Sequence, residues 1–145
     1  MKLSLLHRFK LIFVVLGWST STAAVTLLMI FNGQLLPKGL GGFVVSPNPL
    51  LLGAFYLGCF AICVLATVII GDLSEAIISF FVSYFGAAII TAVVLALPNL
   101  LGIFPYSDAL QHAAVIFTFD AFFPFVFLVN FAGSITGVYL AERQL

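Results

Sequence analysis

Long apolar stretches separated by short polar segments dominate this chain. Four stretches stand out, at residues 11–31, 50–70, 73–97 and 113–141. About 20 helical residues, rising 1.5 Å each, cross the hydrocarbon core of a bilayer, so every stretch is long enough to span it. In lipid these segments must be helical, because a helix satisfies the hydrogen bonds of its own backbone. The pattern therefore predicts an all-α, polytopic integral membrane protein.

The last stretch is too long for one straight crossing. A continuous helix over residues 109–141 would be about 50 Å long, whereas the hydrocarbon core is about 30 Å thick. Pro124 is the expected break, because a proline ring clashes with the carbonyl of the residue four positions earlier, here Asp120. We therefore predict a single transmembrane four-helix bundle domain over residues 1–145. Its spans are expected at about residues 11–31, 50–70, 73–97 and 121–141, with a short extra helix at about 109–119.

Asp120 lies in the phenylalanine-rich sequence FTFDAFFPF. A carboxylate at the centre of a bilayer costs about 2.5–3.5 kcal/mol or more. We therefore expect Asp120 at the outer end of the last helix, where it would cap backbone N–H groups and lie beside the positive end of the helix dipole. The alternative is a continuous, kinked helix that carries Asp120 deeper in the bundle as a proton or cation site.

Composition supports the membrane interpretation. Of the 145 residues, 63% are hydrophobic and only 7% are charged, whereas a soluble domain is about a quarter charged. The net charge is zero, so no basic surface for nucleic acid is expected. The expected partners are membrane lipid, other membrane subunits or further copies of the chain, and no nucleic acid.

The basic residues predict an orientation. Lys2, Arg8 and Lys10 precede the first span, Lys38 follows it, and Arg143 follows the last span. With four spans and both termini inside, four of these five charges are cytoplasmic, as the positive-inside rule favours. The first stretch resembles a signal peptide, but its apolar run continues through residues 25–31, so we expect an uncleaved helix. The sequence thus predicts a multi-pass protein of the cell membrane with both termini in the cytoplasm.

Acidic residues at the connections have the spacing of helix caps. Asp72 precedes the third span and Glu75 follows three residues later, which is the spacing of a capping box. Asp108 and Gln111 have the same spacing before the short extra helix. Asp72 and Glu75 could instead form a paired-carboxylate ion site. Capping explains both acids without a ligand, and the preceding Gly71 suits the end of a helix.

Polar residues also fall near the middle of two spans. The first span carries Ser19, Thr20, Ser21 and Thr22 at its centre, and Asn130 is central in the last. Hydroxyl groups can bond to carbonyls of their own helix. Asn130 has more hydrogen-bonding groups to satisfy, so we expect it to face inward and bond to the first helix. These residues hold helices together in one interpretation, and bind a substrate or ion in the other.

Small residues at four-residue spacing predict which helix faces are buried. Such rows let helix backbones approach closely. The second span has Ala54 with Gly58. The third span has Ser79 with Ser83 and Ala87. The fourth span has Gly133 with Gly137.

The sequence offers little for catalysis or cofactor binding. Cys59 and Cys63 share a helix face, but no histidine or acid is expected at their depth to complete a metal site. His7 and His112 fall outside the spans, so a haem site is not expected either. A nucleophile with an activating base is also missing. We expect no metal, no cofactor and no enzymatic activity.

The sequence favours one function and leaves a second as the alternative. The first is a small non-catalytic accessory or assembly subunit of a larger membrane complex. The second is a small oligomeric transporter or channel, which would use Asp120, Asn130 and the hydroxyl-rich centre of the first span as its polar lining.

Overall fold

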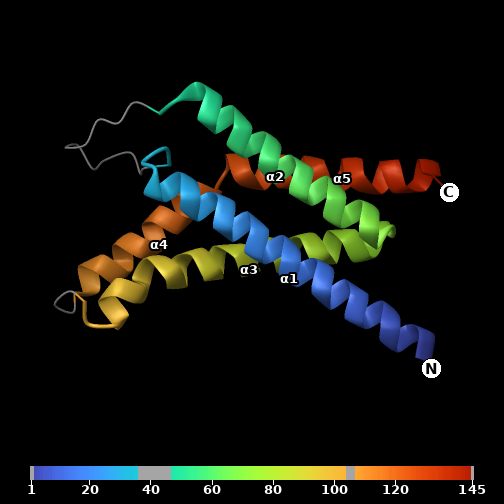
Figure 1. The fold of residues 1–145 in the computed structure, drawn as a ribbon, viewed down its shortest axis with the longest axis horizontal. Helices are drawn as coiled ribbons and strands as arrows, with labels where there is room; N and C mark the ends of the chain where they lie inside the picture. The colour runs from blue at the N-terminus through green and yellow to red at the C-terminus, as the bar shows by residue number, and fades with distance from the viewer. Residues whose placement is uncertain (1, 36–46, 104–106, 145) are drawn as a thin grey trace.

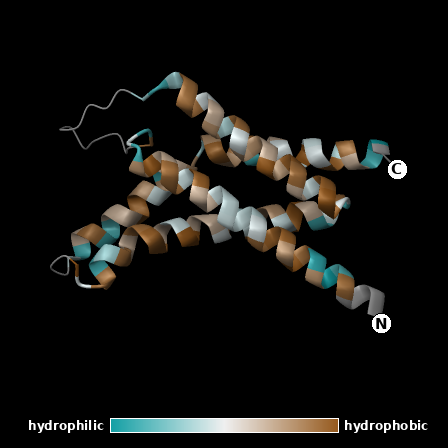
Figure 2. Cartoon of the chain, viewed as in Figure 1, coloured by the Kyte–Doolittle hydropathy of each residue, from teal (hydrophilic) through white to brown (hydrophobic). Residues whose placement is uncertain are grey.

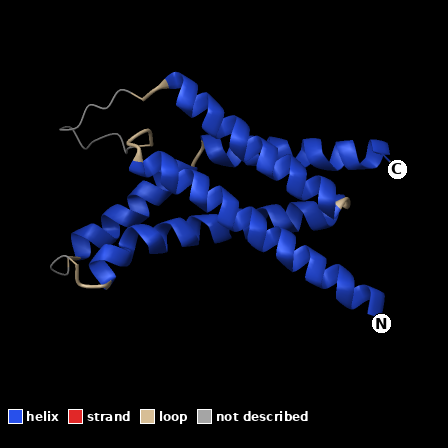
Figure 3. Ribbon diagram, in the orientation of Figure 1, coloured by secondary structure: helices blue, strands red, loops and turns tan. Residues whose placement is uncertain are grey.

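The chain folds into helices joined by short connections (Figures 1 and 3). The computed structural model describes residues 2–35, 47–103 and 107–144. In these ranges it contains five helices and no strand: α1 (Lys2–Phe31), α2 (Pro49–Ile70), α3 (Leu73–Leu100), α4 (Asp108–Phe122) and α5 (Phe125–Gln144). Helices α1, α2, α3 and α5 are long and apolar enough to cross a membrane. The predicted all-α, polytopic membrane fold with one extra helix is therefore confirmed.

The long helices form two contacting pairs. Helix α2 packs along α5, and α1 packs on α3 and also touches α2, which joins the pairs. Both chain ends and the α2–α3 connection lie at one end of the bundle, which we call the terminal end (Figure 1). The last residues of α1 and α3, and the first residues of α2 and α4, lie at the opposite end, the loop end. Four crossings with both termini on one side require this arrangement.

Apolar side chains cover much of the outside of the bundle. Phe13 of α1 is 72% exposed and Leu57 of α2 is 70% exposed. Hydrophilic residues gather toward the helix ends (Figure 2). Near the C-terminus, the Arg143 guanidinium lies 4.6 Å from the centre of the Tyr139 ring. Water would solvate such an exterior poorly, whereas lipid or an apolar partner would cover it.

Two helices are longer than the predicted spans. Helix α1 begins at Lys2 instead of residue 11, so the basic residues Arg8 and Lys10 lie inside it. Helix α3 was expected to end at residue 97, but it continues through Pro98 to Leu100. Pro98 removes the hydrogen bond to the carbonyl four residues earlier, but only Asn99 and Leu100 of the helix follow it, so the disruption stays at the helix end. Gly102, with φ of 70°, then reverses the chain.

The α2–α3 connection has the predicted cap. Gly71 adopts the left-handed conformation, with φ of 77°, and its N–H donates to the Thr67 carbonyl. The Asp72 side chain accepts a hydrogen bond from the Glu75 N–H at 2.9 Å. The Glu75 carboxylate also lies 2.9 Å from Nε2 of His7, a contact between α1 and α3 that the sequence analysis did not foresee. The cap at Asp72 is confirmed, and the His7–Glu75 contact joins the start of α3 to α1.

The predicted cap of the short extra helix is wrong. Ser107, not Asp108, is the N-cap residue of α4, and Asp108 is its first helical residue. The Ser107 backbone is held from α3 instead: Asn99 Oδ1 accepts from the Ser107 N–H at 3.1 Å, and Asn99 Nδ2 donates to the Ser107 carbonyl at 3.2 Å. This two-bond clamp fixes where α4 begins, so it replaces the side-chain cap.

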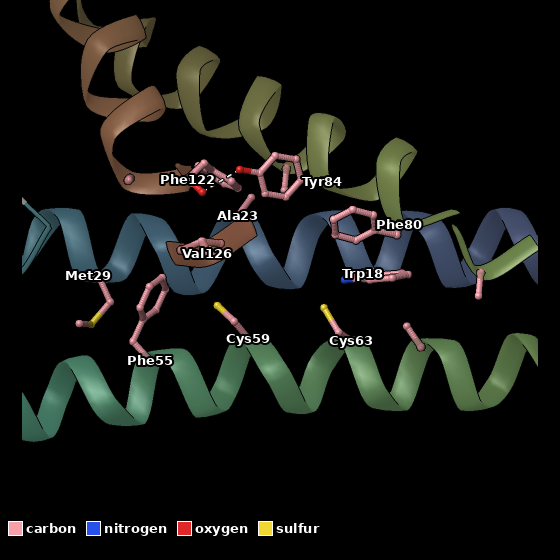
Figure 4. Close-up of a cluster of buried hydrophobic side chains, with 14 of the residues drawn as sticks. Trp18, Ala23, Met29, Phe55, Cys59, Cys63, Phe80, Tyr84, Phe122 and Val126 are labelled. Atoms are coloured by element: carbon pink, nitrogen blue, oxygen red, sulfur yellow. Dashed lines mark hydrogen bonds between the residues drawn. The ribbon is translucent and has the colours of Figure 1, made fainter. Parts of the chain in front are cut away.

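Aromatic rings and small side chains fill the interior (Figure 4). Trp18 of α1 packs against Phe80 of α3, with ring centroids 6.3 Å apart. Cys59 and Cys63 point from α2 toward α1 in the same region, and both are fully buried. Phe122 of α4 and Val126 of α5 belong to the same cluster, so the core lies where α1, α2 and α3 meet the α4–α5 segment.

Candidate functional site

Asp120 lies in the last turn of α4, and the expected cap at the start of the final helix is wrong. Helix α4 continues through Asp120 to Phe122, and α5 begins only at Phe125. Phe123 between them is extended, with φ of −119° and ψ of 138°. A residue that precedes a proline prefers this conformation, so the helix breaks at Phe123 and not at Asp120. The break near Pro124 is confirmed, and the alternative of one continuous helix is contradicted.

The Asp120 side chain is exposed. It lines a small hollow of about 150 Å³, which we call the loop-end hollow. Its lining residues are Gln34 and Leu35 after α1, Pro47, Leu52 and Tyr56 at the start of α2, and Asp120 and Ala121 of α4. Asp120 therefore lies beside the first turns of α2, whereas Phe122, two residues later, bonds to Tyr84 near the middle of α3.

Asn130 faces inward as predicted, but its partner is a different helix. The side chain is 2% exposed, and its Oδ1 accepts a hydrogen bond from the Cys63 thiol of α2 at 2.7 Å. The sequence analysis expected a partner on the first helix, and this detail is wrong. The reason is that α5 packs along α2 more closely than along any other helix. Trp18 of α1 also lies close to Cys63 (Figure 4).

The hydroxyl-rich centre of α1 does not form one polar surface. Ser19 and Thr22 are buried, whereas Thr20 and Ser21 are exposed on another side of the helix. The Ser19 hydroxyl donates to the Val15 carbonyl at 2.8 Å, and the Thr20 hydroxyl donates to the Leu16 carbonyl at 2.8 Å. These local bonds consume the hydroxyl donors, as is common in apolar helices.

Thr22 differs from its neighbours because its buried Oγ1 has no hydrogen-bond partner in the described part of the chain. The Thr26 hydroxyl, one turn later, donates to the Thr22 backbone carbonyl at 2.8 Å. The four residues at the centre of α1 therefore do not converge with Asn130 on a ligand-sized polar space.

The small residues of α5 allow close packing against α2. A Cβ atom added to Gly133 would lie 2.8 Å from Cβ of Cys63. A Cβ atom added to Gly137 would collide with the Thr67 hydroxyl and lie 2.6 Å from the Val64 carbonyl oxygen. The predicted packing role of this glycine pair is confirmed, because the contact leaves no room for side chains.

The serine row of α3 faces α1. Ser79, Ser83 and Ala87 are all buried, and the Ser83 hydroxyl donates to the Val15 carbonyl of α1 at 3.4 Å. A Cβ atom on Gly86 would lie 2.9 Å from Oγ of Ser19. This predicted packing face is also confirmed.

The small-residue pair of α2 is not part of a helix contact. Ala54 is exposed, and a Cβ atom on Gly58 would meet nothing within 4 Å. The prediction that this pair is buried in the bundle is wrong. The opposite face of α2, with Cys59 and Cys63, takes the contacts with α1 and α5 instead.

A concave surface lies between α3 and α4, and we call it the α3–α4 groove. It measures about 420 Å³ and is open to the side of the bundle. Its lining includes Tyr84, Phe85, Ala88 and Ala92 of α3, Val115, Thr118 and Phe119 of α4, and Phe127 of α5. The sequence analysis did not identify it.

Few polar atoms in the α3–α4 groove are available to a ligand. The Tyr84 hydroxyl donates to the Phe122 carbonyl at 2.7 Å (Figure 4). The Thr118 hydroxyl donates to the Ala114 carbonyl at 2.8 Å. The groove therefore suits an apolar occupant.

Metal-binding side chains do not cluster in the described ranges. No group of three or more His, Cys, Asp or Glu residues there could hold a metal ion. Cys59 and Cys63 are free thiols. His112 is exposed on α4, and its Nδ1 lies 2.7 Å from the Asp108 carbonyl oxygen.

Comparisons with protein-family models, with curated proteins and with solved structures found no match to this chain. The chemistry of the groove and of the loop-end hollow must therefore carry the functional argument.

Proposed function

We propose that this protein is a non-catalytic accessory subunit that binds a transmembrane helix of a partner subunit in the α3–α4 groove. The groove itself is the observation that carries the proposal. It is apolar, it opens on the flank of the bundle, and no segment of the described chain fills it. An unfilled apolar groove forgoes the dispersion contacts that close packing provides.

The floor of the groove favours a helix as the occupant. Ala88 and Ala92 of α3 both line it and are four residues apart, so they lie on one face of α3. Small residues at this spacing let a second helix approach closely. The rings of Phe85 and Phe119 at the sides would then pack against the apolar side chains of that helix.

The proposal includes an orientation in the cell membrane. We propose that both termini face the cytoplasm, because that topology places four of the five basic residues inside. The loop end, with α4 and the outer part of the groove, would then face the opposite side. A partner helix would reach the groove laterally, within the bilayer.

The test is co-purification in mild detergent. The wild-type protein is expected to retain one partner at fixed stoichiometry. Ala92→Trp, which places an indole in the groove, is expected to lose that partner while the protein remains folded. Ala54→Trp, on the exposed face of α2, serves as the control and should retain it.

Two results would contradict the proposal. One is a partner that Ala92→Trp retains as well as the wild type does. The other is recovery of further copies of this chain alone, which would make the groove a self-association surface.

The alternative of a small oligomeric transporter or channel has weaker support. A solute would need unsatisfied polar groups along one path. The hydroxyls of Ser19 and Thr20 are bonded to their own helix, and Thr20 lies on a different side from Asn130. Solute flux in liposomes that requires the purified protein would favour this alternative.

A further inference from the structure

The loop-end hollow combines a carboxylate with an aromatic ring. Asp120 enters it from α4 and Tyr56 from α2, while Leu35, Pro47 and Leu52 supply apolar walls. In the described ranges, neither the Asp120 carboxylate nor the Tyr56 hydroxyl has a hydrogen-bond partner. The only ion pair in these ranges joins His7 to Glu75 at the terminal end. The charge of Asp120 is therefore not balanced by a described basic residue.

The helix end beside Asp120 adds negative potential. The last carbonyls of a helix carry the negative end of its dipole. Asp120 lies in the last turn of α4, and Pro124, four residues later, has no N–H to donate to the Asp120 carbonyl. A carboxylate here receives no help from the dipole, unlike an acid at a helix start. A cation would be attracted by both the carboxylate and the helix end.

Other groups hold the hollow in shape. Gln34 Oε1 accepts from the Asn48 N–H at 2.6 Å, which ties the end of α1 to the start of α2. Gln34 Nε2 donates to the Asn32 carbonyl at 3.3 Å. The Tyr56 ring packs against Phe55 and Phe125, with centroids 5.1 and 6.4 Å away. The ring is thus positioned before any ligand arrives.

We propose that the loop-end hollow binds a small ammonium-type cation between the Asp120 carboxylate and the Tyr56 ring. Ammonium groups bind both carboxylates and aromatic faces. A divalent metal ion such as calcium would require six to eight oxygen ligands, and the hollow offers one carboxylate. The ammonium group can belong to a lipid headgroup such as ethanolamine, or to a free amine. This site is independent of the α3–α4 groove.

The first experiment uses the purified full-length protein in detergent. Its melting temperature is measured against increasing ethanolammonium chloride, with sodium chloride at matched ionic strength. The wild type is expected to show a saturable rise with ethanolammonium only. In Asp120→Asn the half-saturating concentration should rise at least about tenfold, since a charge-assisted bond is lost. Asp108→Asn, at the other end of the same helix, should behave as the wild type.

A second pair of variants tests the ring. Tyr56→Phe keeps the aromatic face and should keep most of the response, whereas Tyr56→Leu should weaken it. This pair also decides the matter if Asp120→Asn does not fold. An equal response in wild type, Asp120→Asn and Tyr56→Leu, or an equal response to sodium chloride, would overturn the proposal. A response that appears only in the Lys38→Ala variant would also overturn the proposal. It would mean that the ammonium group of Lys38 neutralises the Asp120 carboxylate in the wild type.

A third measurement identifies the source of the cation. Native mass spectrometry after gentle extraction compares retained phosphatidylethanolamine with phosphatidylglycerol. If the ligand is a lipid headgroup, the wild type should retain the ethanolamine lipid more than Asp120→Asn does, with equal phosphatidylglycerol. If it is a free amine, only the melting-temperature response should depend on Asp120. If neither lipid retention nor the melting-temperature response depends on Asp120, the proposal is contradicted. Both measurements are independent of any partner helix bound in the α3–α4 groove.

Discussion

The α2–α5 contact and the α3–α4 contact are built from similar apolar sequence, yet one is closed and the other open. Gly133 and Gly137 bring α5 so close to α2 that an added Cβ atom would overlap neighbouring atoms. Between α3 and α4, where the rings of Tyr84 and Phe122 meet with centroids 5.5 Å apart, a groove of about 420 Å³ stays open. Glycine residues at the facing positions therefore determine which of these two helix contacts is closely packed within one chain.

The two contacts also differ in how polar groups are used. Asn130 of α5 bonds to Cys63 of α2 in the middle of the closed contact. The open contact is fixed near its two ends, by Tyr84 with the Phe122 carbonyl and by Asn99 with Ser107. Hydrogen bonds thus hold α4 in place without filling the space between the helices. An open groove held between two fixed ends is suited to receive a partner.

Enlarging Gly137 should have the largest effect on stability. Gly137→Leu would drive a side chain into the Val64 carbonyl, which cannot move without shifting α2. Overpacking of this kind should cost about 3 kcal/mol of unfolding free energy. The measurement is equilibrium unfolding in mixed detergent. Gly58→Leu is the control, because nothing lies within 4 Å of a Cβ atom there. Equal losses in the two variants would contradict the close contact.

Removing the buried amide should have the next largest effect. Asn130→Ala leaves the Cys63 thiol without its acceptor and should cost about 1–2 kcal/mol. Asn32→Ala is a suitable comparison, because Asn32 is exposed just after α1 and its side-chain amide donates to the nearby Leu28 carbonyl. The same unfolding assay applies, and a loss at Asn130 no larger than that at Asn32 would remove the amide from the α2–α5 contact.

Loss of the Tyr84 hydroxyl should have a smaller effect. Tyr84→Phe removes the bond to the Phe122 carbonyl but keeps the ring, so the expected cost is about 0.6 kcal/mol. It should appear as faster hydrogen exchange in α4 than in α5, measured by mass spectrometry. Tyr139→Phe, at an exposed position of α5, should change neither helix. Unchanged exchange in α4 would show that this bond does not hold the open contact.

Partial filling of the groove should have the smallest effect and the opposite sign. Ala92→Leu adds methyl groups to unoccupied space and should leave stability unchanged or raise it by up to about 1 kcal/mol. Unfolding in mixed detergent, side by side with Gly137→Leu, makes the contrast direct. A loss like that of Gly137→Leu would mean that the groove is closed in solution.

The sequence predicted the helices well, because their signals are local. Twenty apolar residues in lipid have to be helical, and Asp72 caps α3 from the adjacent position. The break in the fourth stretch was also local, since Pro124 cannot continue a helix. The break lies at Phe123 instead of Asp120, because a residue before proline prefers an extended conformation, and Asp120 is therefore at a helix end and not at the predicted helix start.

The contacts between helices were harder to predict, because a small-residue row does not specify its partner. Gly133 with Gly137 and Ala54 with Gly58 have the same spacing, yet only the first pair is packed inside the bundle. The partner of Asn130 depends on which helix lies next to α5, and sequence spacing carries no such information. The Asn99–Ser107 clamp and the α3–α4 groove likewise arise only when α4 folds back on α3.

Photocross-linking in native membranes tests the open groove most directly. A photoreactive residue is placed at Val115, 62% exposed beside the groove, or at Leu65, 64% exposed on α2. We predict one discrete protein adduct from Val115, which Ala92→Trp abolishes, and only lipid adducts from Leu65. Lipid adducts alone from Val115, or the same protein adducts from both positions, would contradict the assignment of the groove as a subunit-binding surface.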